Sequence, residues 1–254
     1  MQRSIFSLDG KRALVVGGAG EIGYAIAAAL LEFGAYVVIA DKDPDTLVKA
    51  AVLKKEWPNC FGCIVDISDR EQIDDSIINS VNLLGGSIEI LVNAAGIQRR
   101  NPSEIFPEND WDALISVNLT SVFLYSKKVS IGMISNGFGK IINVCSIMSQ
   151  FGGVNIPGYS ASKGGVAQLT KAMSNDLARK GICINAISPG YIKTDMNSAI
   201  LGDSERTAKI LDRTPIGRWG EPIDLKGISV FLASNASDFI TGAVIPVDGG
   251  YSGM

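Results

Sequence analysis

The sequence contains no histidine and only four cysteines in 254 residues. Without histidine the chain cannot build the usual histidine-containing zinc or haem sites. Cys60 and Cys63 form one Cys-x-x-Cys pair, and no second pair is present to complete a four-sulfur metal site. We therefore predict no metal site and interpret these two cysteines as reduced residues of a buried strand, with a redox role as the alternative.

The chain also lacks a surplus of positive charge, with a net charge of −3 and a pI near 5.1. This balance gives no general attraction to nucleic acid or to an anionic membrane. No apolar run approaches the roughly 20 residues of a membrane span, and Met1–Asp9 lacks a secretory hydrophobic segment. We expect a cytoplasmic protein that binds a small-molecule substrate and neither nucleic acid nor membrane.

A strand, a glycine loop and a helix follow one another at the start of the chain. Arg12–Val16 is β-rich, Gly17–Gly23 is glycine-rich, and the alanines and leucines of Tyr24–Phe33 favour a helix. The loop fits the G-x-G-x-x-G fingerprint, in which glycines let the backbone approach a pyrophosphate at a helix N-terminus. A glycine loop needed only for packing is the alternative.

A carboxylate ends the second apolar run, Tyr36–Ala40, at Asp41. An acidic residue there can bind both ribose hydroxyls of an adenosine and repel a 2′-phosphate, so NAD is favoured over NADP. Lys42 weakens this preference because its charge partly offsets the repulsion. After the third strand, Asp66 either approaches the adenine or caps the next helix.

Strands and helices alternate to the end of the chain without a linker or repeat, which predicts one α/β domain over residues 1–254. We expect a doubly wound parallel sheet of seven strands with helices on both faces. The third to seventh strands are expected at 60–65, 88–92, 140–146, 183–188 and 243–247. Helices are expected at 43–57, 68–84 and 110–135. Pro44 would occupy a first helical position, and Pro246 suggests an edge strand.

Tyr159 and Lys163 are four residues apart on a predicted helix and therefore share one face. An ammonium beside the phenol favours the phenolate and would bring the tyrosine pKa toward the operating pH of a general base. Ser146, at the end of the fifth strand, could hydrogen-bond the same substrate oxygen. An ordinary surface pair is the alternative. Asn118, inside a long helix, is either a satisfied polar core residue or the holder of a kink and a water chain.

Together these residues resemble the short-chain dehydrogenase/reductase family across essentially the whole chain. The motifs are Gly17-x-x-x-Glu21-x-Gly23, Asp66, Asn93-Ala94-Ala95-Gly96, Asn118, Ser146, Tyr159-x-x-x-Lys163 and Pro189-Gly190. The resemblance implies a Rossmann fold, a homotetramer, Tyr159 as catalytic acid/base and Ser146 orienting the substrate oxygen. It also implies that Lys163 binds the nicotinamide ribose and lowers the tyrosine pKa, that Asn118 completes a proton relay, and that Thr194 bonds the carboxamide.

Three positions depart from the family pattern, which usually has Thr at Val16, Gly at Glu21 and Asn at Ala94. A carboxylate at Glu21 would repel a pyrophosphate, although an acid in the first turn of a helix favours the helix dipole and could point to solvent. The expected cofactor contacts are Gly17, Gly20, Glu21, Ile22, Gly23, Asp41, Lys42, Asp66, Ile67, Asn93, Ala94, Gly96, Tyr159, Lys163, Pro189, Ile192 and Thr194.

The segments Gly96–Arg100, Asn143–Ser149 and Arg213–Gly220 look like the branch of the family that contains gluconate 5-dehydrogenases and deoxygluconate dehydrogenases. This predicts an NAD-dependent oxidoreductase that acts on a secondary alcohol, or the matching ketone, of a sugar acid. Arg100 is the candidate for binding the carboxylate, or else an interface or surface arginine. The expected substrate contacts are Arg100, Ser146, Gln150 and Tyr159.

A segment at about 192–210 would form a lid over the cleft. Three other functions stay open from the sequence. The chain could be a polyol dehydrogenase, a 3-oxoacyl carrier-protein reductase that shares the catalytic residues, or a dinucleotide-sensing regulator without turnover. NADPH preference and a basic docking patch would point to the reductase. A regulator would be expected to lose a catalytic group, yet Ser146, Tyr159 and Lys163 are all present.

Overall fold

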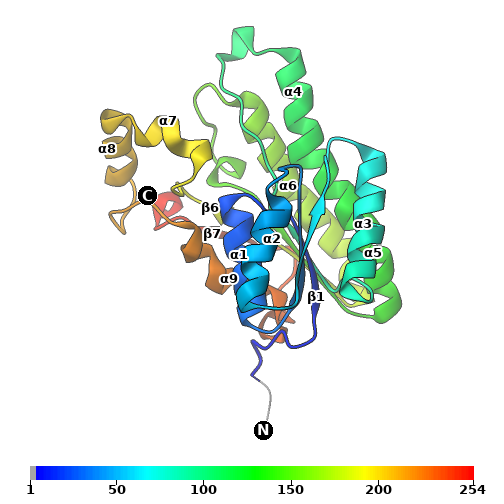
Figure 1. The fold of residues 1–254 in the computed structure, drawn as a ribbon. Coiled ribbons are helices and arrows are strands. Elements are labelled where there is room, and N and C mark those ends of the chain that lie inside the picture. The colour runs from blue at the N-terminus through cyan, green and yellow to red at the C-terminus, as the bar shows by residue number, and fades with distance from the viewer. Residues whose placement is uncertain (1–3) are drawn as a thin grey trace.

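A seven-stranded parallel sheet forms the centre of the computed structural model (Figure 1), which describes residues 4–254. The first part of the N-terminal stretch considered above, residues 1–3, lies outside the described residues. The strands are β1 (Arg12–Val16), β2 (Tyr36–Asp41), β3 (Cys60–Ile64), β4 (Ile90–Asn93), β5 (Gly139–Val144), β6 (Ile182–Pro189) and β7 (Val244–Val247). Their order in the sheet is β3-β2-β1-β4-β5-β6-β7. The predicted fold class is confirmed, and β7 with its proline is an edge strand.

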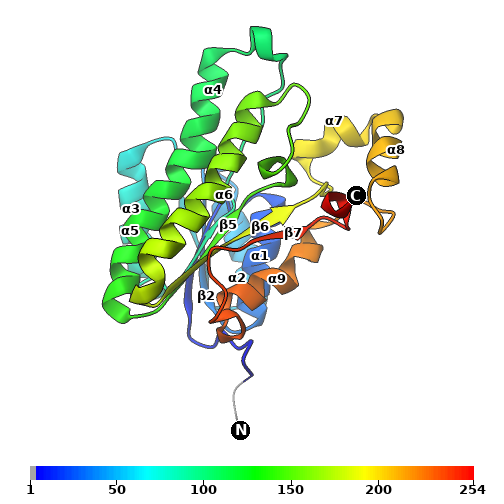
Figure 2. The same ribbon diagram turned by 180° about the vertical axis from the view of Figure 1, so that it is seen from behind.

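Helices cover both faces of the sheet (Figures 1 and 2). The helices are α1 (Glu21–Glu32), α2 (Thr46–Glu56), α3 (Arg70–Leu84), α4 (Glu108–Ile115), α5 (Ser121–Asn136), α6 (Pro157–Leu177), α7 (Ser198–Leu201), α8 (Ser204–Asp212) and α9 (Lys226–Ala233). In β1, Ala13 and Val15 point into the core under α1, α2 and α9, whereas Leu14 and Val16 point into the core under α3, α5 and α6. Both faces are buried, which explains why the strands are apolar at successive positions.

The strand order reverses between β1 and β4, because the chain adds β2 and β3 on one side of β1 and the later strands on the other. In open parallel sheets such a reversal leaves a crevice at the carboxyl ends of the strands, where ligands bind. The glycine loop after β1 and the Ala94–Gly96 segment after β4 both begin at this edge. The fold therefore places the predicted site at the reversal.

Two helix predictions were wrong in detail. α2 begins at Thr46, and Pro44 lies in the preceding turn, because the Asp43 carboxylate accepts the backbone N–H of Asp45 and holds that turn (2.9 Å). The long helix expected at 110–135 is α4 and α5 joined by a π-helical turn, Ser116–Thr120. Single-turn π insertions are often found at functional sites.

Cys60 and Cys63 are both buried on β3 and form no disulfide. Burial raises the pKa of the Cys60 thiol to about 11 and raises that of Cys63 as well. Because the thiolate is the reactive form, this environment disfavours redox chemistry.

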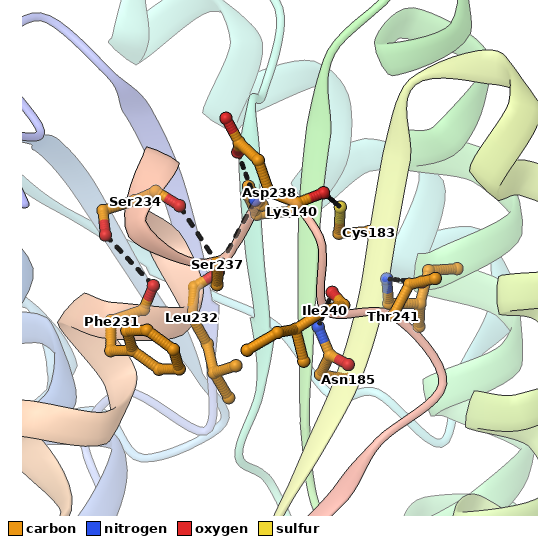
Figure 3. Close-up of polar contacts among 11 residues, drawn as sticks. Lys140, Cys183, Asn185, Phe231, Leu232, Ser234, Ser237, Asp238, Ile240 and Thr241 are labelled. Carbon is orange, nitrogen blue, oxygen red and sulfur yellow. Dashed lines mark hydrogen bonds and ion pairs between the residues drawn. The ribbon is translucent and has the colours of Figure 1, made fainter. Parts of the chain in front are cut away.

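A buried lysine near the start of β5 binds the segment that precedes β7 (Figure 3). It lies at the end of the sheet opposite the crevice. Lys140 on β5 is only 2% exposed, and its Nζ donates to Asp238 Oδ1 (2.8 Å) and Ser237 Oγ (3.3 Å). Asn185 on β6 donates to the carbonyl oxygen of Ile240 (2.8 Å). These bonds satisfy a buried charge and fix the chain that leads into the edge strand.

We predict that Asp238→Ala lowers the free energy of unfolding by about 1–3 kcal/mol, because it removes the charged acceptor of a buried ammonium. Lys140→Met should cost less, since it removes the charge itself and fills the same space. Denaturant titrations of both variants measure this. Lys209→Met breaks the exposed pair with Glu205 and serves as the control, with an effect within about 0.5 kcal/mol. A larger loss for Lys140→Met than for Asp238→Ala would contradict the interpretation.

Candidate active site

The loop between β1 and α1 needs most of its glycines for packing. Gly17 has a φ of +79°, and a Cβ there would overlap the backbone of Ala95. A Cβ at Gly23 would overlap the carbonyl group of Gly17. Gly20 differs, because its Cβ position has no protein atom closer than 3.5 Å. Gly20 therefore leaves free space at the N-terminus of α1, where no side chain of the described residues caps the helix.

A cavity of about 440 Å³ lies at this edge of the sheet. Every expected cofactor contact except Asn93 lines it, as do Ser146, Tyr159 and Lys163. Residues that the sequence reasoning missed also line it: Ala19, Asp43, Lys49, Val65, Ala95, Ile97, Val117, Val144, Cys145, Gly190, Asp195, Met196 and Asn197. Several of these directly follow a strand end, and that position is the signal that could have found them.

Asp41 lies at one end of the cavity, where its carboxylate accepts the backbone N–H of Ala19 in the glycine loop (3.2 Å). Lys49 on α2 comes to the same end and donates to the carbonyl oxygen of Ala19 (2.9 Å) and to Asp43 (3.1 Å). Lys49 follows Asp41 by eight residues across a turn, so no local sequence pattern marked it.

Lys163 is almost fully buried, and its Nζ donates to the carbonyl oxygen of Val144 at the end of β5 (2.8 Å). The same Nζ lies 5.9 Å from the centre of the Tyr159 ring. Ser146 follows on the same side, and its hydroxyl accepts the backbone N–H of Met148 (3.1 Å). The structure thus brings the three predicted residues together on one wall of the cavity.

The electrostatics of this group differ from the expectation. Burial raises the pKa of Tyr159 above its usual value, and a hydrogen bond from Ser146 opposes that shift only in part. Burial also lowers the pKa of Lys163. The Lys163 ammonium is engaged with the carbonyl oxygen of Val144, and the lowering of the tyrosine pKa by Lys163 stays a prediction.

Asn118 is fully buried in the π-helical turn and does not line the cavity. Its side chain accepts from the N–H of Ile97 (2.8 Å) and donates to Ile97 O (3.0 Å) and Ser162 Oγ (3.1 Å). It is a satisfied polar core residue within a distorted helix. These bonds tie the segment after β4 to α6.

Two further predicted contacts lie away from the cavity. Asn93 turns into the layer between sheet and helices, where it donates to Asn143 Oδ1 (2.9 Å) and Ser126 Oγ (3.2 Å). Gln150 is exposed and absent from the lining. Neither prediction had evidence for the direction of the side chain, which is set by tertiary partners.

Arg100 also lies outside this cavity, partly buried and held by Gln98 Oε1 (2.9 Å). Burial lowers its pKa, and the positive charge of Arg206 on α8 adds to that effect. The charge of Arg100 in turn favours the phenolate of Tyr159. Arg100 thus feels the charge of Arg206 and acts in turn on Tyr159, and sequence reasoning missed Arg206 because it is 106 positions away from Arg100.

The segment at 192–210, whose role as a lid stays a prediction, forms short helices. After Thr194 the chain forms a 3-10 turn, Asp195–Asn197, and then α7 and α8. Ile200 and Ile210 pack with Trp219 in a small separate core. The segment is thus anchored at its base by apolar contacts.

The chain is similar over nearly its whole length to known proteins. The family described as enoyl-(acyl carrier protein) reductase matches residues 17–252. The 5-keto-D-gluconate 5-reductase of Escherichia coli K12 is 42% identical over 247 residues, which are 97% of each chain. The 2-dehydro-3-deoxy-D-gluconate 5-dehydrogenase of Pseudoalteromonas atlantica is 43% identical over 255 residues, or 98% of each chain.

Solved structures agree with this similarity. The gluconate 5-dehydrogenase of Burkholderia cenocepacia, in complex with NADP and tartrate, has a TM-score of 0.90 and 42% identity, with 98% of each chain covered. A short-chain type dehydrogenase/reductase of Mycobacterium marinum has a TM-score of 0.89 and 31% identity, again with 98% of each chain covered.

Proposed function

Because the chain belongs to the short-chain dehydrogenase/reductase family, we propose that it oxidises a secondary alcohol of a sugar acid, or reduces the matching ketone. Gluconate and its deoxy or keto derivatives are the proposed substrates. The chain is an enzyme that uses a nicotinamide dinucleotide and acts on CH–OH groups. The observation that carries the proposal is the convergence of Ser146, Tyr159 and Lys163 on one cavity at the sheet reversal.

The cavity suits a dinucleotide at both of its ends. The uncapped N-terminus of α1 presents backbone N–H groups and a positive dipole end to a diphosphate, and Gly20 leaves room for its approach. Asp41 offers a carboxylate to the ribose hydroxyls of the adenosine. Thr194 also lines the cavity and would bond the nicotinamide carboxamide. When bound, the nicotinamide ring supplies the hydride acceptor.

In the proposed reaction Tyr159 takes the proton of the alcohol during oxidation and returns it during reduction. Ser146 hydrogen-bonds the same oxygen, and Lys163 binds the ribose of the nicotinamide. Because burial raises its pKa, Tyr159 keeps its proton near neutral pH and is then an acid ready for ketone reduction. The phenolate needed for oxidation becomes available as the pH rises, so alkaline conditions should favour oxidation.

Arg100 and Arg206 support a substrate that carries a carboxylate. Guanidinium groups bind carboxylates through paired, charge-assisted hydrogen bonds. Neither arginine forms an ion pair with an acidic side chain among residues 4–254, so both are available to a ligand. Polyol oxidation and 3-oxoacyl carrier-protein reduction are the alternatives, and the second finds support in the description of the matching family. The homotetramer and the cytoplasmic location stay predictions.

Tyr159→Phe should reduce turnover by about 10²- to 10⁴-fold, because it removes the oxygen that exchanges the proton. Binding of NADH, measured by fluorescence, should change little since the ring is retained. Turnover within about tenfold of the parent would contradict the assignment of Tyr159 as acid/base.

NAD should be used with a higher kcat/KM than NADP, because the Asp41 carboxylate repels a 2′-phosphate. Asp41→Ala should narrow this difference in steady-state assays with both cofactors. Asp45→Ala is the matched control, because it removes an exposed carboxylate outside the cavity. A parent enzyme that prefers NADP would show that Lys42 and Lys49 outweigh Asp41.

The enzyme should prefer gluconate-type acids to sorbitol and xylitol, and Arg100→Ala should weaken use of the acids selectively. Loss of a charge-assisted hydrogen bond worth about 1.5–3 kcal/mol corresponds to roughly one to two decades in kcat/KM. Arg99→Ala is the control, since Arg99 is exposed and pairs with Asp110 (3.5 Å). Equal or better use of the polyols would refute the sugar-acid proposal. Activity only on a 3-hydroxyacyl thioester would place the enzyme with the carrier-protein reductases.

A further inference from the structure

One hydrogen bond crosses the cavity from the glycine loop to the lid segment. The carboxylate of Glu21, the first residue of α1, accepts the backbone N–H of Asp195 at 2.8 Å. The two residues are 174 positions apart, and both line the cavity. Asp195 follows Thr194 directly and begins the 3-10 turn that leads into α7. This hydrogen bond therefore links the glycine loop to the lid segment, between which a dinucleotide would pass.

This contact bears on cofactor binding because Glu21 is the first residue of α1, where the diphosphate would bind. Its backbone is part of the helix N-terminus toward which a diphosphate would be drawn, and its side chain places a negative charge at the same end. The family pattern has glycine here, and glycine offers no group that could reach Asp195. The carboxylate thus places a negative charge beside the uncapped end of α1, while its hydrogen bond goes to the N–H of Asp195.

Among residues 4–254 no lysine or arginine forms an ion pair with Glu21. Asp195 adds a second carboxylate, and Lys193 is engaged with Glu221 (3.1 Å) on the exposed surface. A diphosphate that enters the cavity therefore meets the Glu21 charge at the helix end. Electrostatic repulsion between the Glu21 carboxylate and the diphosphate acts against binding.

We propose that Glu21 is an internal competitor of the cofactor diphosphate, and that it holds the lid segment to the glycine loop through Asp195 until the dinucleotide displaces it. The inference rests on the proposed dinucleotide site and deepens it. Glu21 is a positioning residue for the lid rather than a catalytic residue. Its replacement should tighten cofactor binding and loosen the lid when no cofactor is added.

The test measures NADH binding by fluorescence and hydrogen exchange of the Asp195 amide, in the full-length parent enzyme and in three variants. Glu21→Gly restores the family residue and removes both charge and acceptor. Glu21→Gln removes the charge and keeps an acceptor. Glu32→Gln, at the other end of α1 beside Lys226, is the matched control.

Glu21→Gly should bind NADH about tenfold more tightly than the parent, equal to about 1.4 kcal/mol. Its Asp195 amide should exchange faster without NADH and regain protection when NADH is added. Glu21→Gln should also bind more tightly while retaining much of the Asp195 protection. Glu32→Gln should match the parent in both measurements. A purely structural role of Glu21 would lower stability without tightening binding.

Unchanged or weaker NADH binding by Glu21→Gly overturns the inference, and so does unchanged exchange of the Asp195 amide. These results leave the proposed function standing as long as the parent binds NADH. Failure of both parent and Glu21→Gly to bind NADH or NADPH would overturn the proposed function together with the inference. The two failures are therefore distinguishable.

Discussion

The hydrogen bond from Lys163 to the carbonyl oxygen of Val144 sets the position of the whole candidate site (2.8 Å). It joins α6 to the carboxyl end of β5, one residue from Cys145 and two from Ser146. Glycines also pack α6 against its helical neighbours: a Cβ at Gly158 would lie 2.8 Å from Leu114 Cδ1 on α4, and one at Gly165 would lie 2.8 Å from Leu119 Cδ2 in the π-helical turn. These contacts hold α6, and with it Tyr159 and Lys163, in a fixed position.

This arrangement removes Tyr159 and Lys163 from water, and the loss of solvation changes the pKa values of both. Burial disfavours the charged forms of both residues, so it raises the pKa of Tyr159 and lowers the pKa of Lys163. A phenol that stays protonated beside a nearby guanidinium, Arg100, fits an enzyme that donates a proton to a ketone oxygen and binds an acid. On the opposite side of the cavity, the charge of Glu21 at the start of α1 would in the same way influence binding, by opposing the cofactor diphosphate.

The fold was predictable from sequence because each strand is a short apolar run bounded by polar or glycine turns, and the alternation is regular. Much of the cavity lining was predictable as well, since residues such as Asp41, Asp66 and Gly96 lie at or just after strand ends. The directions in which the Asn93 and Asn118 side chains point could not be predicted from the sequence. Asn93 pairs with Asn143 across the sheet, and Asn118 turns to Ile97 through a π-helical turn, because tertiary partners decide both. The contact of Glu21 with Asp195 joins distant segments and left no local pattern.

The most direct test of the central claim is to follow the hydrogen itself. The enzyme would be given NAD with gluconate deuterated at one CH–OH carbon at a time, and the reduced cofactor would be analysed by mass spectrometry. Our account predicts that deuterium from one carbon appears in the reduced cofactor, and that label from the other carbons does not. Reduced cofactor without label from any of these carbons, or no reduction with any sugar acid, would contradict it.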